Sequence, residues 1–280
     1  MIVVDLAGGL GNQMFQYAFG RHLSHKYNVP VFLSKSIYNN HLSNRTFDLD
    51  IFRLNPQVVS DYSALRPFAR KEVLCMTEEQ FHFDINALDP LDDVDPLPNP
   101  LIIISGYWQS EKYFKPIEPI IRSEFTFMNG LSGKWLDLYH HITSIDAVMI
   151  NVRRGDYLNS LDYHGVVSLE YLYEGIDRCR KSIRKPYFFV FSDDMDWCRK
   201  NLKDLPDLFF VGEEYYDNKF QSYLQLMIAC KHFIVSNSSF AWWAAWLCPS
   251  TEKIVFAPKR WFTTNTLDTR DLLPESWITL

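Results

Sequence analysis

Short apolar runs alternate with longer stretches of mixed polarity along this 280-residue chain. Runs that are apolar on both faces are typical of strands buried in a parallel sheet. The pattern predicts eight such strands, at residues 2–6, 29–33, 101–104, 147–152, 187–191, 208–211, 233–235 and 253–257. It predicts helices between them at residues 12–27, 169–184, 195–202, 222–230 and 240–247.

Strand–helix alternation starts twice, once at the N-terminus and again near residue 147. Such alternation indicates an α/β protein in which helices cover parallel sheets. We therefore expect two α/β units, residues 1–143 and 144–280, with a C-terminal tail that is free to pack back on the first unit. The Asp- and Pro-rich stretch 89–100 is typical of an irregular surface loop, and segment 36–70 is too weakly periodic to assign.

Composition narrows the class of protein. Apolar residues make up 47% of the chain and charged residues 22%, as in ordinary globular proteins. The net charge of −6 argues against a protein that binds nucleic acid mainly through phosphates. The five cysteines form no CxxC pair, which argues against structural zinc. No secretory signal begins the sequence, and the longest apolar run, 240–248, is too short to span a membrane. We expect a cytoplasmic enzyme, with peripheral association at the inner face of a membrane left open.

A glycine-rich turn, Gly8–Gln13 (GGLGNQ), follows the first predicted strand. Ligands of parallel-sheet proteins bind at the carboxyl ends of strands, and glycines let the backbone approach them closely. Asn12 is positioned to cap the following helix, whose N-terminus would face an anion. The turn is not a dinucleotide-binding GxGxxG motif, because Met14 stands where its last Gly would fall. A tight strand–helix turn without a ligand explains the motif equally well.

Two adjacent arginines, Arg153 and Arg154, leave the predicted strand 147–152. A guanidinium suits phosphate because its N–H groups fork toward two oxygens. Side chains alternate along a strand, so we expect one arginine to face a ligand and the other the scaffold. The alternative for this pair is a structural salt bridge with Asp156.

Acidic residues follow the predicted strand 187–191. Asp193 and Asp194 could accept hydrogen bonds from a nucleoside, bind a metal or cap the following helix. A metal is the less favoured of these, because no further cluster of acids or histidines lies nearby in the sequence.

Four small polar residues, Ser236–Ser239, lie between the predicted strand 233–235 and a helix. Hydroxyls, an amide and free helix N–H groups there could cradle a phosphate, or the serines could simply cap the helix. We expect the neighbouring Trp242 and Trp243 to pack in the core rather than to form a sugar platform. Since no P-loop lysine is present, these strand ends together favour a diphosphate ligand that is not hydrolysed as a nucleoside triphosphate.

Together these motifs resemble the bacterial α-1,2-fucosyltransferases of glycosyltransferase family 11. The resemblance is collinear over nearly the whole chain, and seven segments in this order are specific for the family. They are GGLGNQMFQ (8–16), GYWQSEKYF (106–114), RRGDY (153–157), HGVVS (164–168), FSDDMDWC (191–198), SNSSFAWWAAWL (236–247) and PESW (274–277). The resemblance implies a GT-B-like α/β fold, with two Rossmann-like units facing a cleft. The C-terminal unit would bind GDP-fucose, and the N-terminal unit would shape the acceptor site.

The resemblance also implies an inverting transferase that uses neither a metal nor a cofactor. It would move L-fucose from GDP-fucose to the 2-hydroxyl of a terminal galactose on a glycan, in polysaccharide biosynthesis. Without a metal, fixed cations and dipoles must meet the charge that grows on the leaving phosphate. Arg153 matches the family's phosphate-contacting arginine, and Arg154 supports it. The other residues implied in donor binding are Gly9, Gly11, Asn12, Asn151, Asp193, Asp194, Asn237, Ser238, Ser239 and Phe240.

One position departs from the family. Its pattern begins His-x-Arg-Arg-Gly-Asp-Tyr, and Asn151 stands in place of that histidine. Asn can donate and accept hydrogen bonds but carries no proton near neutral pH. If the histidine contacts the nucleotide, Asn substitutes for it. If it moves a proton, this chain is impaired or uses another group, and Asp156 and His164 are the candidate bases.

Two alternatives to the fucosyltransferase therefore stay open. One is a GDP-sugar-binding protein that has lost its transferase activity, and the other is a transferase that uses a different sugar nucleotide. The irregular region 36–100 is where we expect acceptor specificity to lie. The acceptor glycan and the oligomeric state are left open.

Overall fold

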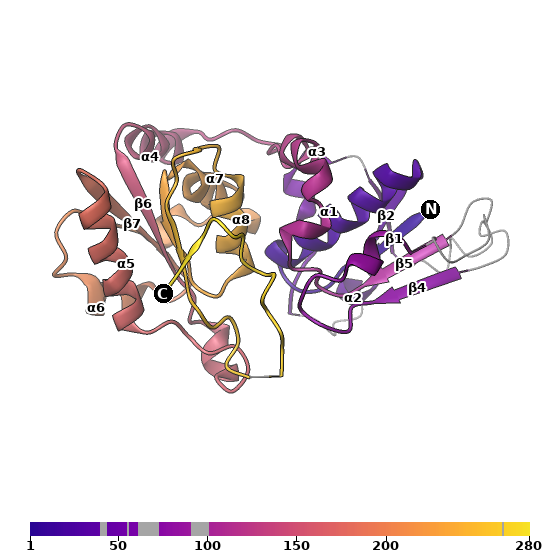
Figure 1. Ribbon diagram of the computed structural model, residues 1–280. Helices are drawn as coiled ribbons and strands as arrows, with labels where there is room; N and C mark the ends of the chain where they lie inside the picture. The colour runs from indigo at the N-terminus through magenta and orange to yellow at the C-terminus, as the bar shows by residue number, and fades with distance from the viewer. Residues whose placement is uncertain (40–43, 55, 61–72, 91–100, 265) are drawn as a thin grey trace. The chain divides into compact units, whose positions relative to one another are not determined.

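A computed structural model describes residues 1–39, 44–54, 56–60, 73–90, 101–264 and 266–280. The chain divides into two compact units (Figure 1). The first comprises Met1–Met128 and Asp268–Pro274, and the second Asn129–Leu267 and Glu275–Leu280. This division differs from the sequence-based boundary after residue 143. The reason is that helix α4 (Gly133–Thr143) packs against α7 (Gln221–Ala229) and β6 (Asp146–Val152) of the second unit.

The first unit is built on a parallel five-stranded sheet in the order β3-β2-β1-β5-β4. The central strand β1 pairs with β2 and β5, so that Ile2 lies beside both Val31 and Ile102. The five strands are β1 (Ile2–Asp5), β2 (Val31–Ser34), β3 (Gln57–Val59), β4 (Val73–Thr77) and β5 (Leu101–Ser105). The helices are α1 (Leu10–Tyr27), which packs on β1 and β2, α2 (Ser36–Asn39) and α3 (Glu118–Glu124).

The second unit is built on a parallel six-stranded sheet in the order β11-β10-β9-β6-β7-β8. Besides β6, its strands are β7 (Pro186–Ser192), β8 (Leu208–Val211), β9 (His232–Ile234), β10 (Val255–Ala257) and β11 (Ile278–Thr279). Besides α4 and α7, its helices are α5 (Leu169–Ser182), α6 (Met195–Leu202) and α8 (Ser239–Leu247).

Alternate side chains of β7 show how the helices cover this sheet. Phe188 and Val190 belong to a core cluster that contains buried residues of α5 and α6. Phe189 and Phe191 point the other way. The Phe189 ring lies 5.8 Å from that of His141 on α4, and the Phe191 ring lies 5.0 Å from that of Tyr223 on α7. Helices therefore cover both faces, which explains why the strands of this unit read as continuous apolar runs.

All eight predicted strands and all five predicted helices are present, with ends that differ by at most two residues. Strands β3, β4 and β11 were not predicted. Strand β11 is only two residues long, whereas β4 carries the apolar run Val73–Met76, which sequence reasoning overlooked although its residues alternate between exposed and half-buried in the sheet. The predicted loop 89–100 lies mostly outside the described residues, which resume at residue 101.

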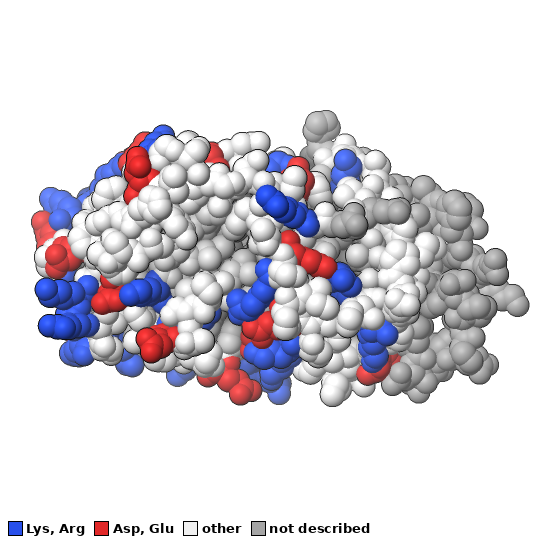
Figure 2. Space-filling model, turned by 90° about the horizontal axis from the view of Figure 1, so that it is seen from above, with Lys and Arg blue, Asp and Glu red and all other residues white. Residues whose placement is uncertain are grey.

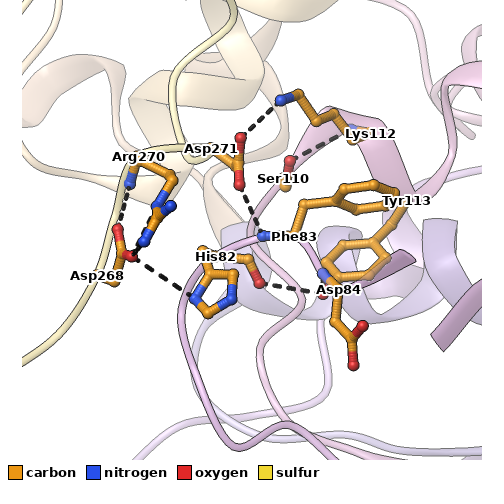
Figure 3. Close-up of polar contacts among 9 residues, drawn as sticks. All are labelled: His82, Phe83, Asp84, Ser110, Lys112, Tyr113, Asp268, Arg270 and Asp271. Carbon is orange, nitrogen blue, oxygen red and sulfur yellow. Dashed lines mark hydrogen bonds and ion pairs between the residues drawn. The ribbon is translucent and has the colours of Figure 1, made fainter. Parts of the chain in front are cut away.

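Segment Asp268–Pro274 returns to the first unit from a distant part of the sequence (Figure 3). The Asp271 carboxylate accepts a hydrogen bond from the backbone N–H of Phe83 (3.1 Å) and pairs with Lys112 (2.6 Å). Asp268 pairs with Arg270, whose hydrogen bonds lower the pKa of Asp268 to about 2. The chain then rejoins the second unit, where β11 pairs with β10.

The surface carries charges of both signs. Figure 2 shows Lys and Arg interspersed with Asp and Glu on one face, where no large area is basic only. This mixture agrees with the modest net charge of −6. Within the residues that the structure describes, no helix is long and apolar enough to cross a membrane.

The packing of α1 on β1 leads to a prediction about stability. A Cβ atom at Gly20 would lie 2.2 Å from Cγ2 of the buried Val4. Gly20→Ala should therefore lower the free energy of unfolding by about 1–3 kcal/mol through overpacking, despite the better helix propensity of Ala. Urea unfolding followed by circular dichroism measures this change.

Gly130→Ala is the matched control, because a Cβ atom at Gly130 meets nothing within 4 Å. It should change the free energy of unfolding by less than about 0.5 kcal/mol. Equal effects of the two substitutions would contradict the close packing of α1 on β1.

Candidate functional site

The carboxyl ends of β9, β6 and β7 bring together most of the sequence-predicted residues of the second unit. These three strands are neighbours in a parallel sheet, so the residues that follow them lie along one edge. Arg153 follows β6, Asp193 follows β7 and Asn237 lies shortly after β9. Ligands of open α/β sheets bind at such an edge.

Arg153 lies between two carboxylates. Its guanidinium pairs with Asp156 at 2.6 Å and with Asp193 at 2.9 Å, and its Cζ lies 5.2 Å from the centre of the Tyr157 ring. The Arg153 side chain is 24% exposed. The salt bridge with Asp156, which the sequence offered as a structural alternative, is thus present. It fixes the guanidinium while leaving part of it accessible.

Arg154 faces the scaffold. Its backbone N–H donates to Asp193 at 2.8 Å, and its Nε donates to Asp194 at 3.2 Å. Its guanidinium also lies over the Trp197 ring, 4.2 Å from the ring centre. The two arginines diverge, as the alternation of side chains along a strand predicts.

The two acids after β7 organise this edge. Asp194 caps α6 by accepting from the backbone N–H of Trp197 (3.1 Å), as one of the sequence-based alternatives predicts. Asp193 reaches both arginines because residue 155 is Gly, where a Cβ would lie 2.7 Å from the Asp193 carboxylate. No group of three or more His, Cys, Asp or Glu that could hold a metal occurs in the described part of the chain.

Asn151 lies within the sheet near the end of β6. Its side chain accepts a hydrogen bond from the Ser236 hydroxyl and donates one to the backbone carbonyl of Phe191 (3.4 Å). Asn151 is buried, with 7% of its surface exposed. It therefore ties β6 to β7 and to the turn after β9.

The serine-rich turn begins α8. Ser238 is the N-cap residue, and its Oγ lies 3.5 Å from the backbone nitrogen of Ala241. Ser239 and Phe240, the first two residues of the helix, are half-buried. Capping by serine and a partly open helix N-terminus therefore coexist at this turn.

The tryptophans of α8 belong to the core, as predicted. Trp242 and Trp243 are fully buried, with ring centres 5.0 Å apart. Trp242 also packs against Trp277, with the ring centres 5.5 Å apart, so the PESW segment supports α8 from the C-terminal end of the chain.

Asn237 joins two loops at this edge. Its Nδ2 donates to the backbone carbonyls of His164 (2.7 Å) and Trp261 (3.1 Å). Its Oδ1 is buried and has no hydrogen-bond partner among the described residues. The His164 ring stacks on Tyr157, with the ring centres 4.3 Å apart.

A cavity of about 420 Å³ lies beside these loops, lined by His164, Asn237, Thr263 and the exposed Lys259 and Arg260, among others. Sequence reasoning missed the two basic residues, although the signal was present. They come two and three residues after the last residue of β10, at the same edge of the sheet.

In the first unit, the predicted cap of α1 is wrong. The helix begins at Leu10, two residues earlier than expected, and Gly9 takes the N-cap position without a side-chain hydrogen bond. Asn12 therefore lies inside the first turn, where its Oδ1 accepts from Nε2 of Gln109 (2.8 Å). Gly8 has φ +75°, and a Cβ there would lie 2.4 Å from Nδ2 of Asn12.

Two buried glutamines of α1 hold the glycine-rich turn through hydrogen bonds to its backbone and to neighbouring segments. Nε2 of Gln13 donates to the carbonyls of Gly8 (3.1 Å) and Thr46 (2.7 Å). Gln16 accepts from the backbone N–H of Ala7 (3.0 Å) and donates to the carbonyl of Gly106 (2.8 Å). Sequence reasoning missed both, although polar residues within an otherwise apolar stretch were the available signal.

Known proteins of similar sequence identify the family. The family model described as Glycosyl transferase family 11 matches residues 1–280. An alpha-1,2-colitosyltransferase of Escherichia coli is 31% identical, over 99% of this chain and 98% of that protein. The galactoside alpha-(1,2)-fucosyltransferase 1 of Ateles belzebuth is 28% identical, over 86% of this chain and 63% of that protein.

A solved structure shares the fold. The crystal structure of the alpha-1,6-fucosyltransferase NodZ soaked with GDP-fucose aligns with a TM-score of 0.54 and 14% identity, over 91% of this chain and 94% of that one. The predicted GT-B-like architecture of two Rossmann-like units is thereby confirmed. Because the family match runs from the first residue to the last, the chain belongs to glycosyltransferase family 11.

Proposed function

We propose that this glycosyltransferase moves L-fucose from GDP-fucose to the 2-hydroxyl of a terminal galactose on a glycan, with inversion and without a metal. The observation that carries the proposal is the convergence of Arg153 and the N-terminus of α8 at the ends of the neighbouring strands β6 and β9. The names of two relatives, a colitosyltransferase and a galactoside fucosyltransferase, both specify an alpha-1,2 linkage.

The leaving group explains why this convergence matters. As the bond between sugar and phosphate breaks, negative charge grows on the β-phosphate of GDP and must be stabilised where it develops. A forked guanidinium and the positive end of a helix dipole both suit a phosphate. Arg153 is fixed by Asp156 and Asp193 before a ligand arrives, so it needs little reorganisation at the moment of reaction.

The other candidates take supporting roles in this proposal. Asn237, Ser238 and the first turn of α8 surround the diphosphate, while Asp193 and Asp194 orient the arginines beside the nucleoside. Asp156, whose side chain is 45% exposed, and His164, which lines the cavity, remain the two candidate bases. The cavity is our proposed location for part of the acceptor.

A second candidate donor is GDP-colitose, favoured by the 31% identity to the colitosyltransferase. Colitose is fucose without its 3-hydroxyl group, so the two donors differ by one polar group. The alternative of a binding protein without turnover gains no support from Asn151. Its polar atoms bond to Ser236 and Phe191 within the sheet, a structural use that requires no proton transfer.

A donor comparison tests the proposal. The protein is incubated with a terminal galactoside and equal amounts of GDP-fucose and GDP-colitose, and the products are identified by mass spectrometry and NMR. We expect an α-1,2-linked fucosyl product in excess. A site that hydrogen-bonds the 3-hydroxyl would reject the deoxy analogue by up to about 10⁴-fold.

GDP-mannose serves as the control donor, from which no transfer is expected. A preference for GDP-colitose would show that the transferred sugar is colitose and not fucose. Binding of GDP without transfer from any donor would instead support the binding-protein alternative.

Removal of metal tests the electrostatic assignment. The transfer rate in EDTA should stay close to the rate without chelator, because Arg153 and the α8 N-terminus are proposed to meet the charge on the leaving GDP. Loss of most activity, with recovery on adding Mg²⁺ or Mn²⁺, would transfer that role to a divalent cation.

Substitution of the two arginines tests which of them faces the donor. Arg153→Ala should lower kcat by the equivalent of about 2–4 kcal/mol, as when an oxyanion donor is removed. Arg153→Lys should restore only part of the lost kcat, since Lys supplies a positive charge but not the paired N–H donors of a guanidinium. Arg154→Ala should cost less turnover, because Arg154 contacts Asp194 and Trp197.

Steady-state kinetics of the three variants measure these effects, with thermal unfolding as the check on folding. A larger loss of kcat for Arg154→Ala than for Arg153→Ala would show that the directions of the two side chains are assigned wrongly.

A further inference from the structure

The HGVVS segment, residues 164–168, lines the cavity of about 420 Å³ in the second unit. It forms one wall, and residues that follow β10, between positions 258 and 263, form another. Apart from His164, neither wall has a role in the function proposed above. All the residues that line the cavity belong to the second unit, and its volume is in the range of ligand pockets, about 300–1,000 Å³.

Hydrogen bonds hold the two walls of the cavity together. The backbone N–H of Thr263 donates to the carbonyl of Tyr163 (3.0 Å), and Oγ1 of Thr263 donates to the carbonyl of Leu161 (2.9 Å). Nδ2 of Asn237 donates to one carbonyl of each segment. Gly165 has φ +65°, and a Cβ there would lie 2.6 Å from Cγ2 of Thr263, so the walls approach this closely only because residue 165 is Gly. The cavity is therefore shaped before a ligand binds.

Two cationic side chains line this cavity. Lys259 and Arg260 are exposed, and neither forms an ion pair with another residue that the structure describes. Leu280 also lines the cavity, and its backbone oxygen accepts the backbone N–H of Lys259 (2.9 Å). No lining side chain in the described part of the chain is Asp or Glu. By contrast, acids from the same edge of the sheet pair with Arg153 and Arg154. The side chains of the cavity therefore favour an anion.

One aromatic ring separates the cavity from Arg153. The centre of the Tyr157 ring lies 5.2 Å from Cζ of Arg153 and 4.3 Å from the centre of the His164 ring, which lines the cavity. Lys259 and Arg260 follow β10, which β9 separates from β6, so two strand spacings of about 4.8 Å lie between them and Arg153. This spacing favours a second anionic group, distinct from the phosphate that Arg153 is proposed to bind.

We propose that the acceptor glycan carries an acidic group, a carboxylate or a phosphate, and that Lys259 and Arg260 bind this group in the cavity. This inference rests on the proposed function, in which the cavity holds part of the acceptor. The N–H groups of Arg fork toward two oxygens of either anion, and Lys adds a compact positive charge. Since the terminal galactose is neutral, the acidic group belongs to a neighbouring sugar of the glycan.

Acceptors that differ only in charge test the proposal. Transfer from GDP-fucose is measured to galactosyl-glucuronic acid and to its uronamide, in which a neutral amide replaces the carboxylate. We expect kcat/KM to be about tenfold higher for the acid, mainly through KM, as for hydrogen bonds to a charged group. Galactosyl-glucose 6-phosphate, compared with galactosyl-glucose, forms the second arm, and the arm with the larger ratio identifies the anion. Equal kcat/KM for the charged and neutral members of both arms would overturn the inference.

Substitution of the two cations tests whether the preference arises in the cavity. Lys259→Gln/Arg260→Gln should remove the preference for the acid, and Arg260→Glu should reverse it. Arg184→Gln/Lys185→Gln is the matched control. It alters another exposed Arg–Lys pair, which precedes β7 and therefore lies at the opposite edge of the same parallel sheet. It changes the net charge equally and should keep the preference. An equal loss in both double variants would indicate general attraction to the charged protein and would overturn the inference.

Binding measurements separate this inference from the donor site and from the proposed function. In calorimetry, Lys259→Gln/Arg260→Gln should bind GDP as tightly as the wild type does, and weaker binding would assign both cations to the donor diphosphate and overturn the inference. If the wild type transfers no fucose, the proposed function fails on its own. Binding of the acid and of the uronamide is then compared by ligand-observed NMR in the presence of GDP. Stronger binding of the acid that disappears in the double variant would still support the inference, and equal binding would overturn it.

Discussion

One carboxylate, that of Asp193, fixes the chain at the carboxyl edge of the second sheet. Asp193 accepts the backbone N–H of Arg154 with one oxygen and pairs with the guanidinium of Arg153 through the other. This double contact fixes the course of the chain as it leaves β6, and it requires Gly at position 155, where a Cβ would lie 2.7 Å from the carboxylate. Two cations side by side at a strand end are stable because acids from the next strand neutralise them.

Buried amide side chains also hold loops and strand ends in place in each of the two units. Asn151 and Asn237 connect strand ends and loops of the second unit, and Gln13 and Gln16 hold the glycine-rich turn of the first. An amide side chain offers both a donor and an acceptor, so one residue can satisfy two backbone groups that would be costly to bury unpaired. The loops that carry the candidate site are thereby fixed by hydrogen bonds that need no ligand.

The sequence predicted most of the scaffold because parallel strands covered on both faces leave continuous apolar runs. Strand β4 was missed although Val73–Met76 form an apolar run, and the cap of α1 was assigned wrongly because Gly9 takes that position without a side chain. The contact of Asn12 with Gln109 joins residues 97 positions apart, so no local pattern could indicate it. Lys259 and Arg260 could have been found, since they follow a predicted strand at the same edge.

The surroundings of Arg153 show how this edge can be both rigid and open to an anion. Asp193 is held in place by the Arg154 backbone, and its side chain is 25% exposed. Asp156 is 45% exposed and contacts Arg153 from a short turn three residues along the chain. Water already screens the exposed partner, so its pairing contributes less to stability. In the proposed function, a phosphate would therefore displace Asp156 more easily than Asp193, so that Arg153 would keep the support of Asp193 while it binds the ligand.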